Sequence, residues 1–148
     1  MKRLLLYPAL LVGGLSTLGG CDSDVRKAQY FTQGMYLYEQ RCLSCHGADG
    51  AGLGRLYPPL AGADYLAENP RAVICGVKWG MRGEMVVNGV TYNQNMPGQK
   101  DLRALEIAQI VTYIRNAWGN EADRTTVEEV EAALRACQDT PPTHVPVL

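Results

Sequence analysis

Apolar side chains recur every three to four residues in three stretches of this 148-residue chain, which is the spacing of one face of an α-helix. The stretches are residues 25–41, residues 102–118 and a last segment that begins at Thr126. A shorter helix is expected from Arg71 to Trp79, because Asn69 and Pro70 before it suit the N-cap and the first helical position. The pattern therefore predicts a mainly helical protein.

Short polar residues mark the expected ends of these helices. Asp24 and Asp101 precede the first two stretches and are predicted to be their N-caps. Thr126 and Glu129 have the spacing of a capping box, in which each side chain bonds the backbone amide of the other residue. Gly119 follows the second stretch and is predicted to end it.

Between the helices the pattern changes to loops and one hairpin. Residues 84–92 hold two short β-prone runs joined by Asn88-Gly89, which predicts a β-hairpin as the only β-structure. Residues 47–54 are too rich in glycine for a stable helix, so we expect a loop that passes close to a flat object. Pro58 and Pro59 continue that loop as extended chain.

The first 21 residues resemble a bacterial export signal. Lys2 and Arg3 precede an apolar run, residues 4–18, that is too short and too rich in glycine for a membrane span. The run ends in Gly19-Gly20-Cys21, which is similar to a lipobox whose cysteine receives a lipid. The alternative is an ordinary signal peptide that is cleaved elsewhere. Acylation of Cys21 would hold the protein at a membrane surface without a transmembrane helix.

Cleavage before Cys21 changes the size and charge of the chain. It would remove 20 residues and leave 128, with a net charge of −3 in place of −1, because the signal holds two cations and no acid. That length fits one domain. The negative charge argues against a nucleic-acid binder, and 47% apolar with 20% charged residues argues against disorder.

The strongest chemical signal is Cys42-Leu43-Ser44-Cys45-His46. Two thiols three residues apart can add to the two vinyl groups of one haem, and the adjacent histidine then reaches the iron. The alternatives are a thioredoxin-like redox pair, which would need a strand before it, and half of a zinc site, for which the chain offers no second Cys or His pair. Export to an oxidising space and the position of His46 favour haem.

Two cysteines of the mature chain remain, Cys75 and Cys137. In an oxidising compartment they could pair and close a loop of 62 residues. Spacing cannot show that their Cα atoms approach each other, so two buried free thiols remain the alternative.

The sixth ligand of a histidine-bound haem iron separates electron carriers from gas binders and catalysts. Met96 is the predicted ligand, because Pro97 and Gly98 stiffen and turn the loop that carries it. The other candidates are packing residues by pattern or lie in the proline-rich tail: Met35, Met81, Met85 and His144. Ligation by His46 and Met96 would close the site to substrate and favour ferrous iron.

The mature chain resembles the class I, monohaem cytochromes c in more than the haem motif. Gly34, Tyr38 and Cys42 follow one another at intervals of four, as the first-helix glycine, aromatic residue and first haem cysteine of that family do. Ile110 and Tyr113 resemble the residues with which the family's terminal helix crosses that glycine.

A Pro-x-Leu after the haem loop is also present, at Pro58 and Leu60. The resemblance implies that the carbonyl of Pro58 accepts a hydrogen bond from the axial histidine. Three strings, residues 57–62, 87–97 and 113–120, resemble haem domains that accompany quinoprotein or flavoprotein dehydrogenases and some copper nitrite reductases. Trp79 has no clear counterpart and is either core packing or a donor to a haem propionate.

The resemblance implies an all-α cytochrome c fold, with three to five helices around one covalently bound haem c, a small β-hairpin and an extra C-terminal helix. The expected organisation is a lipoprotein signal peptide (1–20), a lipidated linker (21–24), the cytochrome c domain (25–119), a helix packed on it (120–138) and a flexible tail (139–148).

The expected function is electron transfer between membrane or periplasmic redox partners, not catalysis. The expected place is the periplasmic face of the cell envelope, with a lipid anchor in the inner membrane, because Asp22 resembles a retention signal there. The alternatives are a fixed subunit of a respiratory dehydrogenase or oxidase complex, and a haem protein that binds a gas or peroxide. Four cations are candidates for a basic rim that meets partners: Lys78, Arg82, Lys100 and Arg103.

Overall fold

The computed structural model describes residues 20–137 of the chain. The predicted signal segment, apart from Gly20, and the predicted tail with His144 therefore lie outside the described residues. Among the described helices, none is both long and apolar enough to cross a membrane.

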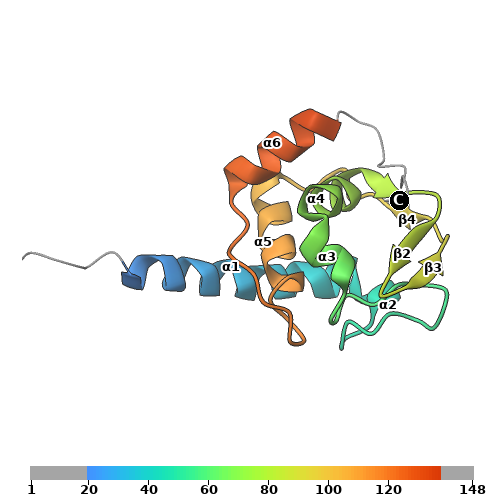
Figure 1. Cartoon of the computed structure of the whole chain (residues 1–148). Coiled ribbons are helices and arrows are strands. Elements are labelled where there is room, and N and C mark those ends of the chain that lie inside the picture. Colours follow the sequence, from blue (N-terminus) through green and yellow to red (C-terminus); the bar gives the residue numbers. More distant parts are fainter. Residues whose placement is uncertain (1–19, 138–148) are drawn as a thin grey trace, which may run out of the picture.

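The described chain is mainly helical, as the spacing of apolar residues predicts (Figure 1). Its helices are α1 (Gly20–Arg41), α2 (Leu43–His46), α3 (Asp64–Glu68), α4 (Pro70–Trp79), α5 (Ala104–Ile114) and α6 (Val127–Cys137). The core lies where α4, α5 and α6 pack against one another and α5 packs on α1, and its most buried side chains include Ile107, Val111 and Val130.

The contact between α1 and α5 depends on a glycine. Gly34 is buried in α1, and a Cβ atom there would collide with the backbone carbonyl of Gln109 and the Cβ of Tyr113. Tyr38, one turn further along α1, packs its ring 5.3 Å from that of Tyr113. The spacing of Gly34 and Tyr38 therefore reflects a close crossing of the two helices.

The predicted hairpin is present, but it is not the only β-structure. Strands β2 (Met85–Val87) and β3 (Val90–Tyr92) pair antiparallel through a turn in which Asn88 and Gly89 both have positive φ. A second antiparallel pair, β1 (Gly80–Met81) with β4 (Met96–Pro97), was not predicted. The prediction that the hairpin is the only β-structure is therefore wrong. The second pair leaves no signal in the local sequence, because each of its strands has only two residues and the two strands lie far apart along the chain.

Two predicted N-caps are also wrong. Helix α1 begins at Gly20, so Asp24 lies inside it, and the segment predicted as a linker is helical. Helix α5 is capped at Arg103, whose backbone amide donates to Glu106 at 2.8 Å. Asp101 instead accepts from Arg41 at 2.8 Å, a contact across the fold that the local sequence does not reveal.

Helix α6 begins at Val127 after a connecting segment and packs on α4 and α5. The capping box predicted at its start is present: the Thr126 amide donates to Glu129 at 2.6 Å, and the Glu129 amide donates to the Thr126 hydroxyl at 3.1 Å. Cys75 of α4 and Cys137 of α6 form a disulfide in the structure, with their Cα atoms 6.3 Å apart.

Candidate functional site

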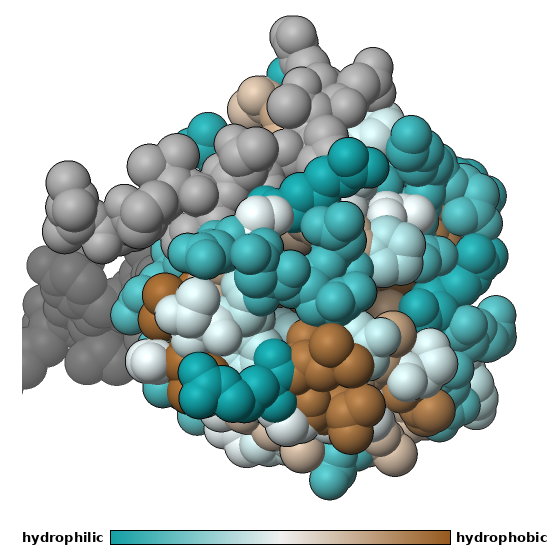
Figure 2. All heavy atoms as spheres, turned by 90° about the vertical axis from the view of Figure 1, so that its right-hand side faces the viewer, coloured by the Kyte–Doolittle hydropathy of each residue, from teal (hydrophilic) through white to brown (hydrophobic). Residues whose placement is uncertain are grey.

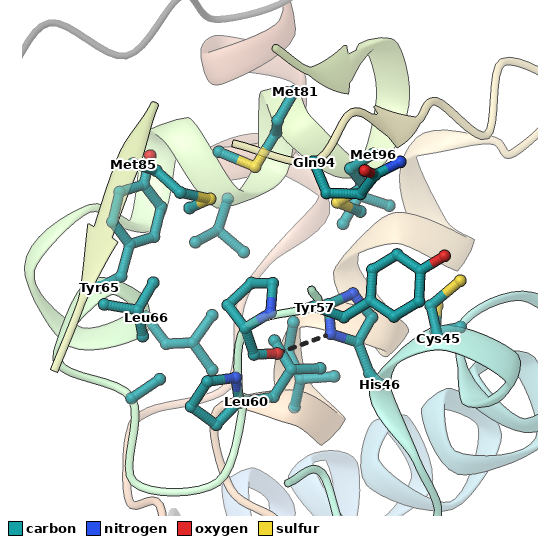
Figure 3. A pocket seen from close by; sticks show the side chains of 18 of the residues that line it. Cys45, His46, Tyr57, Leu60, Tyr65, Leu66, Met81, Met85, Gln94 and Met96 are labelled. Carbon is teal, nitrogen blue, oxygen red and sulfur yellow. Dashed lines mark hydrogen bonds between the residues drawn. The ribbon is translucent and has the colours of Figure 1, made fainter. Parts of the chain in front are cut away.

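A cavity of about 260 Å³ lies between the haem-motif segment and the strands β1, β2 and β4 (Figure 3). This volume is slightly below the roughly 300 Å³ at which the range for small-molecule and cofactor pockets begins. Its lining is almost entirely apolar and includes all six residues predicted to bind the cofactor: Cys42, Cys45, His46, Pro58, Leu60 and Met96. The fold therefore brings residues from positions 42 to 96 to one place.

His46 is held in one orientation at the end of α2. Its side chain is buried, and its Nδ1 lies 3.1 Å from the carbonyl oxygen of Pro58. A carbonyl only accepts hydrogen bonds, so Nδ1 carries the proton and Nε2 is left to bind a ligand. Burial lowers the pKa of His46, while the bond to Pro58 acts in the opposite direction, so the imidazole is neutral near pH 7.

The loop after the motif is compact enough to place Pro58 beside His46. The amide of Gly52 donates to the carbonyl of His46 at 3.0 Å, and a Cβ atom on Gly52 would collide with the backbone of Tyr57 and Pro58. The amide of Leu60 donates to Gly50 at 2.7 Å. The glycines of this loop were predicted to let it pass close to a flat object. In the structure they also let one backbone segment of the loop pack against another.

The two motif cysteines are free thiols that line the cavity next to His46. Cys42 is the N-cap residue of α2 and Cys45 lies within its single turn, and both line the cavity. Burial raises the pKa of the Cys42 thiol to about 11, with Cys45 adding to the shift and Arg41 opposing it. Both cysteines lie in the folded protein without a disulfide between them.

Three methionines line the same cavity, and Figure 3 shows them on the side away from Leu60. Met96 of β4 and Met81 of β1 are paired residues in the antiparallel register, and Met85 comes from β2. Met81 packs closely on Gly76 of α4, where a Cβ atom would meet its sulfur. Met35 packs against the core from α1 and does not line the cavity.

The position of Met96 is fixed by close backbone contacts. A Cβ atom on Gly80 would lie 2.5 Å from the carbonyl oxygen of Met96, and one on Gly98 would collide with the backbone of Trp79. Residues larger than glycine at either position would push β4 away from α4. The sequence predicted only that Gly98 turns the loop after Met96. It did not predict that Gly80 packs against the same backbone segment.

Polar side chains outside the cavity hold the loop that follows the haem motif. The Tyr38 hydroxyl donates to the carbonyl of Gly47 at 2.6 Å, and the Trp118 indole donates to that of Ala48 at 3.0 Å. Asn120 donates to the carbonyls of Leu60 and Ile114, 2.8 Å each, and so joins the loop to the end of α5. In the sequence, Asn120 stood out only as the last residue of 113–120, a string that resembles haem domains of dehydrogenases.

Two residues considered from sequence do not belong to the cavity. Trp79 does not line it, and the Trp79 indole nitrogen is buried without a hydrogen-bond partner in the described part of the chain. Lys78, considered for a basic rim, instead donates to the backbone carbonyls of Lys100 and Leu102. Arg103 pairs with Glu106 at 3.2 Å, so of the four rim candidates Arg82 and Lys100 are left with neither an ion pair nor a side-chain hydrogen bond in residues 20–137.

The donor set of the cavity fits a haem. Apolar walls suit a porphyrin ring, two thiols are placed to bond its vinyl groups, and an imidazole nitrogen and a thioether are two common ligands of its iron. Zinc is a poor fit, because no group of three or more Cys, His, Asp or Glu side chains lies together within residues 20–137.

Comparison with known proteins agrees with this chemistry. A model of the family described as "Cytochrome C oxidase, cbb3-type, subunit III" matches residues 29–114. Cytochrome c-552 of Thermus thermophilus is 35% identical over 150 residues, which cover 95% of this chain and 91% of that protein.

The cytochrome c subunits of two quinone alcohol dehydrogenases are also similar. That of Gluconacetobacter polyoxogenes is 36% identical over 107 residues and 66% of this chain, and that of Gluconobacter oxydans is 35% identical over 131 residues and 84% of this chain. The chain spans only 21% and 27% of the length of these two subunits. The chain belongs to the cytochrome c family, and it is therefore an electron-transfer protein with covalently bound haem c.

Proposed function

We propose that the chain carries one electron at a time on a haem whose iron is bound by His46 and Met96 and whose ring is bonded to Cys42 and Cys45. The observation that carries this proposal is that these four side chains line one cavity. When bound, the haem supplies the one-electron couple of its iron. The chain holds it in place and sets how readily the iron accepts an electron.

The residues around the iron ligands have separate tasks in this proposal. The carbonyl of Pro58 orients the His46 imidazole and makes it a stronger donor. Apolar residues such as Leu66 and Ile114 exclude water from the ring. The soft sulfur of Met96 favours ferrous iron and occupies the position at which a gas or substrate would bind.

The face that meets redox partners is the one that carries the cavity and the loop after the motif. Apolar atoms gather on this side of the molecule in Figure 2. The loop contributes Leu53 and Leu56, whose side chains are 59% and 45% exposed. Such a patch on an otherwise polar surface favours short-lived docking, with Arg82 and Lys100 available to steer acidic partners.

We also propose that residues 1–20 direct export, that Cys21 anchors the protein to the periplasmic face of the inner membrane, and that its partners are membrane-bound dehydrogenases or oxidases. The names of the alcohol dehydrogenase subunits support a dehydrogenase partner. A fixed subunit of such a complex is the second candidate, and the same two relatives favour it.

The ligand assignment is tested by the spectra of protein from a host that matures c-type cytochromes. We expect a reduced spectrum typical of haem c and, in the oxidised protein, the weak band that arises from sulfur bound to ferric iron. Carbon monoxide should not bind quickly to the ferrous protein near pH 7. Rapid binding would indicate an open site and would support a gas-binding or peroxide-binding protein instead.

The anchor and the choice between carrier and subunit are tested on protein purified from its native membranes. We expect the mass of a lipid on an N-terminal Cys21 and, in mild detergent, a particle of the size of one chain. An unmodified N-terminus elsewhere would contradict the anchor. A large particle that keeps a dehydrogenase would favour the fixed subunit.

A further inference from the structure

The segment that carries Met96 is docked on the C-terminal end of α4. Beyond the pairing of β1 with β4, the amide of Gln99 donates to the carbonyl of Val77 at 2.8 Å. Gly98 lies so close to the backbone of Trp79 that no side chain fits between them. These contacts fix residues 96–99. The next residues have one backbone bond, from the amide of Leu102 to the carbonyl of Gln99 at 3.1 Å, and it joins them to residue 99 and not to α4.

Lys78 is the side chain that holds that next part of the segment. Its Nζ donates to the carbonyl oxygens of Lys100 and Leu102, each at 2.7 Å. Hydrogen bonds from an ammonium group are shorter and stronger than those between neutral groups, and the bond to Leu102 is partly buried. One residue of α4 therefore fastens two carbonyls of the segment that follows Met96.

A second side-chain contact to this segment is weaker. Arg41 donates to Asp101 at 2.8 Å and to Gln99 at 3.4 Å, and the side chains of Arg41 and Asp101 are 37% and 60% exposed. Exposed ion pairs contribute little to stability because water and salt screen them. Besides the burial of the Leu102 side chain in the core, Lys78 is the principal polar tie between α4 and residues 100–102.

We propose that Lys78 is a positioning residue for the axial ligand Met96: its ammonium group keeps residues 97–102 closed against α4, and so keeps the sulfur on the iron. Removing the ammonium would leave the carbonyls of Lys100 and Leu102 without these donors and make opening of the segment easier. Opening would withdraw Met96 from the iron. This inference rests on the proposed ligation by Met96.

The test compares Lys78→Met with Lys100→Met in the haem-loaded protein. Both variants lose one cation from the same region, but only Lys78→Met loses the two hydrogen bonds, since Lys100 contributes its backbone carbonyl. The readouts are the sulfur-to-iron band of the ferric protein on heating and the affinity of the ferric protein for imidazole, which displaces the methionine.

We expect Lys78→Met to bind imidazole about tenfold more tightly than the unmutated protein, and its band to disappear at a lower temperature. Lys100→Met should stay within about twofold of the unmutated protein. Lys78→Arg, which keeps donors at the same place, should lie closer to the unmutated protein than Lys78→Met does.

The outcomes separate this inference from the ligand assignment. If the unmutated protein lacks the band, ligation by Met96 fails, whatever Lys78 does. If the band is present and Lys78→Met behaves like Lys100→Met, the role of Lys78 is overturned. Equal weakening in Lys78→Arg and Lys78→Met would also overturn it, because it would indicate packing and not hydrogen bonding. If Lys78→Met does not fold, Lys78→Gln takes its place, since it also removes the ammonium group: a change in imidazole affinity larger than that of Lys100→Met supports the role, and an equal change overturns it.

Discussion

Replacing Met96 with alanine is expected to abolish the sulfur-to-iron band and to open the iron to external ligands. Met96 is held over the cavity by β4, and alanine removes the thioether while leaving the backbone pairing with β1 intact. Loss of a thioether that favours ferrous iron should lower the reduction potential by on the order of 0.1 V, a small part of the roughly 0.8 V that axial ligands span. Spectra, carbon monoxide binding and redox titration measure the three effects.

Met81→Leu is the matched control for Met96→Ala. Met81 lines the same cavity from the paired position on β1, and leucine keeps its apolar volume where the side chain packs on Gly76. We expect this variant to keep the band and to exclude carbon monoxide. If Met81→Leu loses the band and Met96→Ala keeps it, the ligand is Met81 and not Met96.

Replacing Gly34 with valine is expected to lower the free energy of unfolding by about 3 kcal/mol or more, or to prevent folding. A Cβ atom at this position would overlap the carbonyl of Gln109, so α1 and α5 would have to move apart along their whole contact. Denaturant unfolding of the haem-loaded protein measures the loss. The ring contact between Tyr38 and Tyr113 would be disturbed by the same movement.

Gln33→Val provides the control for Gly34→Val. Gln33 is the neighbouring residue on α1 and is exposed, so valine there tests the cost of a β-branched residue in a helix without a collision. We expect a loss below about 1 kcal/mol. If the two variants lose similar amounts of unfolding free energy, the close approach of α1 and α5 at Gly34 is not what makes valine destabilising there.

Local patterns in the sequence were sufficient for most of the helices and for the hairpin. Asn69 and Pro70 placed the start of α4 correctly, and Asn88-Gly89 placed the turn between β2 and β3, because both signals act within a few residues. The capping box at Thr126 and Glu129 is another local signal that the structure reproduces. Elements of this kind are set by neighbouring residues and are readable without the fold.

The features that could not be read from the sequence depend on distant partners. Asp101 looked like an N-cap, but Arg41, which lies 60 residues earlier, takes its carboxylate. The pair β1 and β4 has too few residues for a periodic signal, and its cause is the close approach of Gly80 and Gly98. The tie from Lys78 to Leu102 is invisible for the same reason, since an isolated lysine predicts only a solvated surface.

The candidate site was more predictable than the packing that builds it. Attachment of one ring, as proposed for Cys42, Cys45 and His46, requires a fixed spacing, so its signal is a short string in the sequence. The bond from His46 to Pro58 was implied only by family resemblance, and the structure contains it. Which of Met81, Met85 and Met96 binds the iron depends on how β1, β2 and β4 pack, and the spectra of Met96→Ala and Met81→Leu are the direct test.

In a protein anchored through Cys21, helix α1 would also limit how far the haem site could move toward or away from the membrane. The helix is continuous over 22 residues, from Gly20 to Arg41, and a straight helix of that length measures about 33 Å. With a lipid on Cys21, the haem cysteines would sit at the far end of a stiff arm instead of a slack tether. An electron donor or acceptor in the same membrane would then have to present its own redox centre at a matching height above the lipid headgroups.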